Sequence, residues 1–195
     1  MRRAFVFLLL LLAVPLHAAD VEAGAQHVIA IPRGDSGELD IATSRGFGAH
    51  VEVFWSDRVS TRVAAVLVNP AAILYPDDPP PSDLDLGTLG LDIYSVTARV
   101  HLAPRRGFSA FAGGGAALVS VGNLDDRFGE EVEIEFDPET TFVAEAGVRY
   151  RIHPRIVLEV GAAYLPLELN GAPAPVPPTI GVDPLIVSAA AAWRF

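Results

Sequence analysis

Apolar and polar residues alternate along most of this chain with a period of two, and this pattern constrains the fold more than any other feature. Residues 93–102 read IYSVTARVHL, with tyrosine, valine, alanine and leucine on one face and serine, threonine, arginine and histidine on the other. Residues 141–152, TFVAEAGVRYRI, repeat the pattern. Because successive side chains of a β-strand point to opposite sides, the alternation predicts strands with one apolar face.

Eight segments carry this pattern, and most are about the 9–11 residues that a tilted strand needs to cross a hydrocarbon core. They are Ala25–Ile31, Arg45–Trp55, Ser60–Asn69, Ile93–Leu102, Ser109–Val121, Thr140–Ile152, Arg155–Leu167 and Leu185–Phe195. The fifth, rich in glycine and alanine, leaves its facing ambiguous. Half of all residues (51%) are hydrophobic, yet beyond residue 19 no apolar run approaches about 18 residues, which argues against membrane-spanning helices.

The connections between these segments alternate in length. Short turns follow Trp55, Leu102 and Ile152, whereas polar stretches rich in proline, glycine and acidic residues occupy 32–44, 70–92, 122–139 and 168–184. Short turns on one side and long loops on the other are typical of outer-membrane barrels. A sheet in a bilayer must close because it cannot leave an edge unpaired. We therefore predict an all-β, eight-stranded, antiparallel up-and-down transmembrane β-barrel in the cell outer membrane, with both termini on the periplasmic side.

A soluble sandwich or lipocalin-like barrel would also alternate. Two observations favour the membrane barrel: charges occur at mid-strand on the polar face, and aromatic residues gather near strand ends, where interfacial girdles lie. Those aromatic residues are Trp55, Tyr94, Phe108, Tyr150, Tyr164, Trp193 and Phe195.

The first 19 residues have the order of a secretory signal peptide. Arg2 and Arg3 precede an apolar run, and the small residues Ala18 and Ala19 follow it. The run is shorter than the about 20 residues of a spanning helix, so a membrane anchor is the weaker alternative. We expect a signal peptide over 1–19 and the barrel over 20–195. Without cysteine, the chain has neither a disulfide nor a lipoprotein anchor.

Seven ionisable residues of the polar faces are predicted to point into the lumen. They are His50, Glu52, Arg62, Arg99, Glu145, Arg149 and Glu159. They could form a constriction that selects solutes, or a salt-bridged core that fills the barrel. An eight-stranded barrel is only just wide enough for side chains to fill it, and unpaired charges there are costly, which favours the second interpretation.

Nothing in the pattern predicts catalysis, a cofactor or a metal centre. His101 and His153 are expected toward the periplasm, and His50 lacks a neighbouring serine motif, so no histidine is expected beside a hydroxyl at the outer leaflet. No His/Asp/Glu set has metal-ligand spacing. The net charge of −10 argues against nucleic acid as a partner. Acidic residues crowd two long connections, where they could meet cations held by lipopolysaccharide or simply keep the loops solvated.

Four stretches resemble the outer membrane protein W (OmpW) family. They are RGFGAHVEVFWSDRVSTRVAAVLVNP, GFSAFAGGGAALVSV, TFVAEAGVRYRIHPRIVLEVGAAYL and IGVDPLIVSAAAAWRF, the last being similar to the family's final strand. The resemblance implies a porin-like, non-enzymatic barrel that assists small hydrophobic molecules across the outer membrane, with exit through the wall.

Two prolines bear on such an exit. Pro70 and Pro166 lie near the outer ends of predicted strands, where a missing N–H breaks a ladder bond. Each break could open a lateral gap or merely end pairing as a bulge. At the other end of the last strand, Trp193 and Phe195 resemble the terminal signal by which the barrel assembly machinery recognises such strands. The alternative function is a closed structural or adhesive barrel with a salt-bridged lumen, whose acidic extracellular loops bind a partner.

Overall fold

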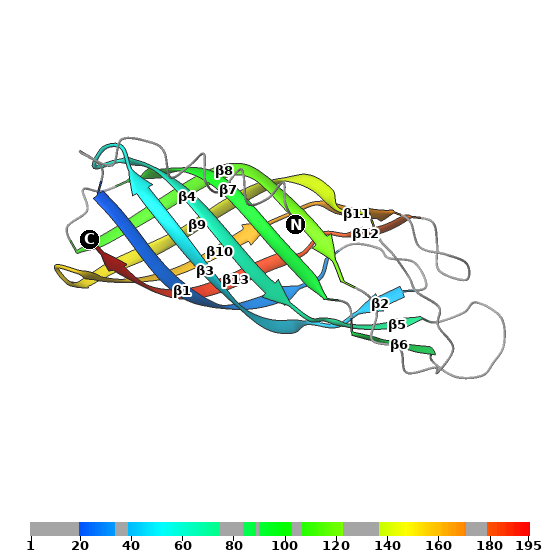
Figure 1. Ribbon diagram of the computed structural model, residues 1–195. Coiled ribbons are helices and arrows are strands. Elements are labelled where there is room, and N and C mark those ends of the chain that lie inside the picture. The colour runs from blue at the N-terminus through cyan, green and yellow to red at the C-terminus, as the bar shows by residue number, and fades with distance from the viewer. Residues whose placement is uncertain are drawn as a thin grey trace.

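Eight strands close into one antiparallel barrel in the computed structural model, which describes residues 20–33, 39–74, 84–88, 90–102, 107–122, 137–170 and 179–195 (Figure 1). In order around the wall these strands are β1 (Asp20–Ile31), β13 (Leu185–Arg194), β10 (Ile156–Tyr164), β9 (Glu139–His153), β8 (Phe108–Val121), β7 (Leu91–His101), β4 (Val59–Val68) and β3 (Ser44–Phe54). The predicted fold class is confirmed. In the described part of the chain, no helix is long and apolar enough to cross a membrane. The expected signal peptide, 1–19, lies outside the described residues.

The first and last strands pair with each other and close the wall. Their register runs from Glu22 opposite Arg194 to Ile31 opposite Leu185. The Phe195 N–H donates to the carbonyl of Val21 at 3.0 Å, so the last residue of the chain still belongs to this ladder.

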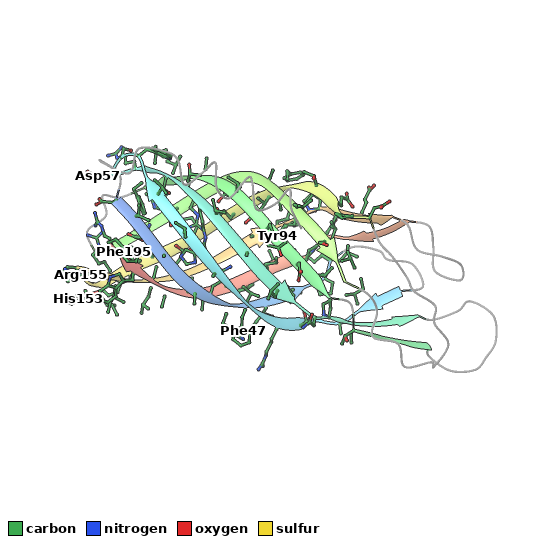
Figure 2. The ribbon with its side chains drawn as sticks, in the orientation of Figure 1. Phe47, Asp57, Tyr94, His153, Arg155 and Phe195 are labelled. Carbon is green, nitrogen blue, oxygen red and sulfur yellow. The ribbon has the colours of Figure 1, made fainter. Side chains whose placement is uncertain are left out.

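The short turns lie at the end of the barrel where β1 begins and β13 finishes. Figure 2 shows Asp57, His153, Arg155 and Phe195 together there. In the turn after β3, the Ser56 hydroxyl accepts the N–H of Val59 at 3.1 Å, and the carbonyl of Val59 accepts the N–H of Trp55 at 3.0 Å. A hydroxyl that satisfies a turn N–H is the usual role of serine in such loops.

The long connections differ from the prediction because parts of them are strands. The stretches expected as loops carry β2 (Leu39–Ile41), β5 (Ala71–Leu74) and β6 (Leu84–Thr88), which form one small sheet, and the hairpin of β11 (Leu167–Asn170) and β12 (Thr179–Val182). Both extend beyond the barrel at the end opposite the short turns (Figure 1). The predicted strand 155–167 therefore splits at Leu165 and Pro166, and the first strand begins at Asp20 instead of Ala25. Most of the acidic residues of connections 70–92 and 122–139 lie outside the described residues.

The outer surface of the barrel is apolar, as the alternation predicts. Large hydrophobic side chains are exposed on every barrel strand from β3 to β10, and the aromatic ones occur toward both ends of the strands. Among them are Phe47, Trp55, Tyr94, Phe108, Phe142, Tyr150, Tyr164, Trp193 and Phe195. An exposed apolar band flanked by aromatic residues fits a hydrocarbon environment.

Candidate functional site: a two-layered barrel interior

The barrel interior has two layers of different chemistry. The half near the short turns holds charged side chains that are buried or, for Glu145, half-buried. We call them the charged plug: Glu22, Glu52, Arg62, Arg99, Glu145, Arg149 and Glu159. The other half holds an apolar layer made by residues of most strands: Val28, Ala30, Ile41, Val66, Val68, Leu91, Ile93, Ala117, Val119, Val143, Leu165, Leu167, Val182 and Ile186.

Arg99 is the centre of the charged plug. Its guanidinium donates to Glu145 through Nε at 2.8 Å and through Nη2 at 2.6 Å, and its Nη1 lies 3.1 Å from Glu159 and 3.3 Å from Glu52. Only 1% of Arg99 is exposed, and its Cζ lies 4.1 Å from the centre of the Phe111 ring. A buried guanidinium with several carboxylate partners is the geometry that offsets the cost of desolvating charges.

Small residues on β8 and β9 make room for this arrangement. Gly113 lies between Arg99 and Glu145 in the ladder, and a Cβ at that position would be 3.0 Å from Cγ of Arg99. A Cβ at Gly147 would be 2.6 Å from Cζ of Phe111, so the phenyl ring also depends on a glycine opposite it. Which side of the fifth predicted strand points inward, ambiguous from the sequence, is therefore determined by the size of the side chains that pack against it.

Two further arginines flank Arg99. Arg62 forms an ion pair with Glu159 and donates to the side-chain oxygen of Gln26. Arg149 forms an ion pair with Glu22, lies 3.7 Å from Glu52 and has its Cζ 4.9 Å from the centre of the Phe54 ring. The network thus reaches across the barrel, from β1 and β3 to β9 and β10.

The structure places all seven predicted lumen residues inside the barrel. Six of them form ion pairs in the charged plug. The seventh, His50, is 5% exposed, and its Nδ1 has no hydrogen-bond partner among the described residues. Sequence reasoning missed Glu22, Gln26, Ser60 and His101, which are also buried inside. Glu22 lies before the predicted first strand, Ala25–Ile31, because the structure extends that strand back to Asp20. Gln26, Ser60 and His101 lie within predicted strands, on faces that the structure turns inward.

Ser60, His101 and Glu52 come together near the short-turn end. The Ser60 hydroxyl donates to Glu52 at 2.5 Å, and Nε2 of His101 lies 2.9 Å from the same hydroxyl and 3.3 Å from Glu52. In a catalytic relay the acid and the hydroxyl occupy different ring nitrogens, whereas here both lie at Nε2. Ser60 is fully buried, and the three groups act as part of the charged plug. Among the described residues, no cluster of three metal-ligating side chains occurs.

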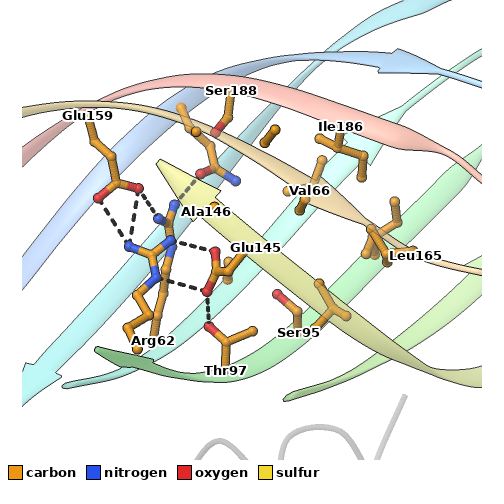
Figure 3. Close-up of a pocket in the computed structure, with 18 of the residues that line it drawn as sticks. Arg62, Val66, Ser95, Thr97, Glu145, Ala146, Glu159, Leu165, Ile186 and Ser188 are labelled. Carbon is orange, nitrogen blue, oxygen red and sulfur yellow. Dashed lines mark hydrogen bonds and ion pairs between the residues drawn. The ribbon is translucent and has the colours of Figure 1, made fainter. Parts of the chain in front are cut away.

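A cavity of about 50 Å³ lies where the two layers meet. Figure 3 shows Glu159, Arg62, Glu145 and Thr97 on one side of it, and Val66, Leu165 and Ile186 on the other. Val143 of β9 and several alanine and glycine residues of β9 and β10 complete much of the lining: Ala146, Gly161, Ala162 and Ala163. The cavity is therefore bordered by charge toward the short turns and by aliphatic side chains toward the long connections.

The wall beside this cavity has an incomplete ladder. In the described residues, pairing of β9 with β10 stops at Ala144 and Tyr164, although Glu139–Val143 of β9 continue to pair with β8 on their other side. We call the contact between Glu139–Val143 and Leu165–Asn170 the outer seam. The hydroxyl of Thr141 donates to the carbonyl of Pro166 across it. On its lipid side the Phe142 and Tyr164 rings lie with centroids 6.5 Å apart.

The opposite side of the same segment is held firmly. Leu165 donates to the carbonyl of Pro184 at 3.3 Å, and the β10–β13 register continues without a shift into β11 and β12. The Asp183 carboxylate accepts the N–H of Leu167 and the hydroxyl of Tyr164, at 3.3 and 3.2 Å. The break at Pro166 is thus confined to the side that faces β9.

Pro70 lies in a different setting. Val68 pairs with Leu91 before it and Ala71 with Thr88 after it, in the same register. On its other side the N–H of Ala42 donates to the carbonyl of Ala71 at 2.9 Å. Pairing therefore resumes on both sides of this proline.

Known structures share this architecture, although no protein-family model and no curated protein match the sequence. The outer membrane protein OprG from Pseudomonas aeruginosa matches with a TM-score of 0.69 and 11% identity, over 91% of this chain and 95% of that chain. The outer membrane protein AlkL matches with a TM-score of 0.61 and 16% identity, over 94% of this chain and 93% of that chain. The attachment invasion locus protein Ail of Yersinia pestis matches with a TM-score of 0.53 and 17% identity, over 91% and 97%.

At these identities the likeness shows a shared fold. The resemblance predicted from the sequence is confirmed at that level, because OprG and AlkL have the fold of the OmpW-like barrels. With its apolar outer surface, the chain is a barrel of the cell outer membrane.

Proposed function

We propose that this barrel assists the passage of small apolar molecules across the outer membrane, and that they leave the interior sideways through the outer seam. The observation that carries the proposal is the cavity beside Val143 and Leu165, the two residues that would pair next if the β9–β10 ladder continued. Apolar side chains line the interior from the long connections to this point. An apolar solute gains free energy when such a surface replaces water around it.

The charged plug supports a lateral exit over an axial one. Its carboxylates and guanidiniums are buried and bonded to each other across the barrel. Passage along the axis would require an apolar molecule to separate these pairs, at a cost of several kcal/mol for each ion left without a partner. At the outer seam no ladder pairing holds Glu139–Val143 to Leu165–Asn170 in the described residues; side chains make the contact instead. A single neutral hydrogen bond such as that from Thr141 contributes about 0.5–1.5 kcal/mol.

The size of the cavity points to slender solutes. A volume of about 50 Å³ holds a few heavy atoms, far less than the roughly 300–1,000 Å³ of sites for drug-sized ligands. Flexible unbranched chains could therefore pass a section at a time, whereas bulky rings would require the wall to open widely. We place the route at Pro166 and not at Pro70, because pairing resumes on both sides of Pro70.

A reversible cross-link tests this route, because the chain has no cysteine of its own. Thr141→Cys combined with Pro166→Cys places two thiols across the outer seam, and Asn69→Cys combined with Gly90→Cys places two across the seam beside Pro70 as the control. The measurement is uptake of a radiolabelled medium-chain alkane by cells that carry each barrel, with and without a reductant.

We expect the oxidised pair at the outer seam to lose uptake and to regain it on reduction, while the control pair transports equally in both states. Equal uptake by the oxidised and reduced forms of the Thr141/Pro166 pair would exclude exit at this seam. Uptake no greater than in cells without the barrel would exclude the transport function altogether.

The charged plug also favours a second candidate, a closed structural or adhesive barrel without transport. A network that crosses the whole barrel fills it as a structural core would. In this case the acidic long connections would meet a partner, such as lipopolysaccharide with its bound cations, and no cross-link would change the uptake of apolar molecules. On either function the terminal residues Trp193 and Phe195 are proposed to be read by the barrel assembly machinery.

A further inference from the structure

Two serine residues lie at the level of the barrel interior where the charged plug meets the apolar layer. Ser95 lies on the inward face of β7, between the buried Ile93 and the buried Thr97. Ser188 follows Ile186 on the inward face of β13. Both serines line the cavity between the two layers, and Figure 3 shows them between the ion pairs and the aliphatic side chains.

The hydroxyls of both serines are open to the cavity. In the described part of the chain neither hydroxyl has a hydrogen-bond partner, whereas the Thr97 hydroxyl in the same lining donates to Glu145 (Figure 3). The ladder neighbour of Ser188 on β10 is Gly161, and a Cβ at that position would lie 3.7 Å from the Ser188 oxygen. The missing side chain therefore leaves this hydroxyl free to bond to whatever occupies the cavity.

A solute that enters the cavity must replace the water around these hydroxyls. The volume of about 50 Å³ exceeds the roughly 10–15 Å³ that one water requires, so water bonds to the hydroxyls when no solute is present. A purely apolar solute displaces this water without replacing its hydrogen bonds, which weakens binding. A solute with a hydrogen-bonding head restores the bonds, because a serine hydroxyl both donates and accepts. Buried polar groups left unpaired are the usual basis for rejection of an analogue that lacks such a head.

The ion pairs beside the cavity determine the charge of that head. Arg62 is paired with Glu159, and Arg99 is paired with both Glu145 and Glu159. Among the described lining residues, a carboxylate head would thus meet no unpaired guanidinium, and an ammonium head no unpaired carboxylate. Burial of a charge without a partner costs far more than burial of a neutral group that keeps its hydrogen bonds. The cavity therefore favours an uncharged head.

The aliphatic side of the cavity accommodates the tail of such a solute. Because the cavity holds only a few heavy atoms, the head and its first carbons fill it, and the rest of the chain lies against the apolar layer or in the outer seam. We propose that the preferred solutes are unbranched medium-chain alcohols, whose hydroxyl is bound by Ser95 and Ser188 during passage. This selectivity rests on the proposed transport function and adds the two residues that determine it.

Two solutes of equal chain length test the selectivity. Cells that carry the barrel are given radiolabelled 1-octanol or radiolabelled octane, and the rate in cells without the barrel is subtracted from each. The combined variant Ser95→Ala and Ser188→Ala should lower the ratio of the octanol rate to the octane rate by about two- to tenfold for each hydroxyl removed, which is the effect of one neutral hydrogen bond. The octane rate should stay equal or rise. Ser120→Ala removes a hydroxyl from β8 outside the cavity lining and should keep the wild-type ratio.

The outcomes separate this selectivity from transport itself. Barrel-dependent uptake of octane with an equal ratio in the wild type and the double variant overturns the role of the two serines and leaves lateral transport intact. Faster uptake of octanoate or octylamine than of 1-octanol contradicts the uncharged head. Absence of barrel-dependent uptake of every solute excludes transport and selectivity together. The heat-modifiable band on unboiled gels corrects each rate for the amount of folded barrel.

Discussion

Arg99 of β7 and Glu145 of β9 form their ion pair across Gly113 of β8, a residue without a side chain that lies between them in both ladders. The strands that supply the pair are not neighbours, so the contact depends on the empty volume over β8. The strand β8, which is rich in glycine and alanine, is therefore the one that allows the charged plug to form.

Filling that volume should break the pair. Gly113→Val places carbon atoms against Arg99 and against the Ala98 carbonyl, and it separates Glu145 from its partner, which is expected to cost about 3–5 kcal/mol in the free energy of unfolding. Gly114→Val is the matched control, because a Cβ there meets only a carbonyl at 3.5 Å. Urea unfolding in detergent micelles compares the two. Similar midpoints for both variants would show that the volume over Gly113 is not required.

Removal of the central cation should open the axis of the barrel. Arg99→Ala leaves Glu52, Glu145 and Glu159 without their shared partner, so fewer barrels should assemble. In the barrels that do assemble, the three carboxylates should repel one another and widen the lumen. In planar bilayers we expect no channel events from the wild type and discrete events from the variant. Arg155→Ala, at an exposed turn residue, should stay silent. Steady conductance by the wild type would show that the charged plug does not close the lumen.

Loosening the outer seam should accelerate uptake. Thr141→Val keeps the shape of the side chain but removes the hydroxyl that bonds to the carbonyl of Pro166, at an expected cost in stability of about 0.5–1.5 kcal/mol. Initial rates of alkane uptake should rise while the amount of folded barrel stays nearly constant. Thr61→Val removes the partner of Trp55 Nε1 on the outer surface near the short turns and serves as the control. An unchanged rate in Thr141→Val would argue that the seam is not the exit.

Deletion of Phe195 should lower assembly instead of transport by each assembled barrel. The residue is 77% exposed on the lipid side, and its backbone closes the last bond of the β1–β13 ladder. Phe195→Tyr keeps both the aromatic ring and the backbone group and should assemble normally. The yield of the heat-modifiable band on unboiled gels measures assembly, and uptake divided by that yield measures transport. A full yield from the deleted chain would contradict a role for this residue in assembly.

Much of the fold could be predicted because a membrane barrel imposes one repeating rule on every strand. Residues such as Tyr94 and Arg99 reveal their faces by alternation alone, since lipid and lumen demand opposite chemistry. The extensions β5 and β11 were not predicted, because beyond the membrane the demand for an apolar outer face ends and the alternation weakens.

The site was less predictable, since it depends on what lies across the barrel. Alternation places Glu52 and Arg62 inside but does not show which carboxylate each guanidinium meets. Pro70 and Pro166 look alike in the sequence, near the ends of predicted strands. Only the register of the neighbouring strands shows that pairing resumes on both sides of one and stops on one side of the other.

The pairing of β1 with β13 also sets the order of events during biogenesis. Of the eight barrel strands, the one that begins at Asp20 leaves the ribosome first, yet one of its two neighbours, β13, follows all the others in the chain. Until Arg194 reaches Asp20, both strands present an unpaired edge of the kind that joins to other chains. The nascent polypeptide must therefore be kept apart from its copies over its whole length, and the time spent unclosed is the period in which this barrel is most open to aggregation.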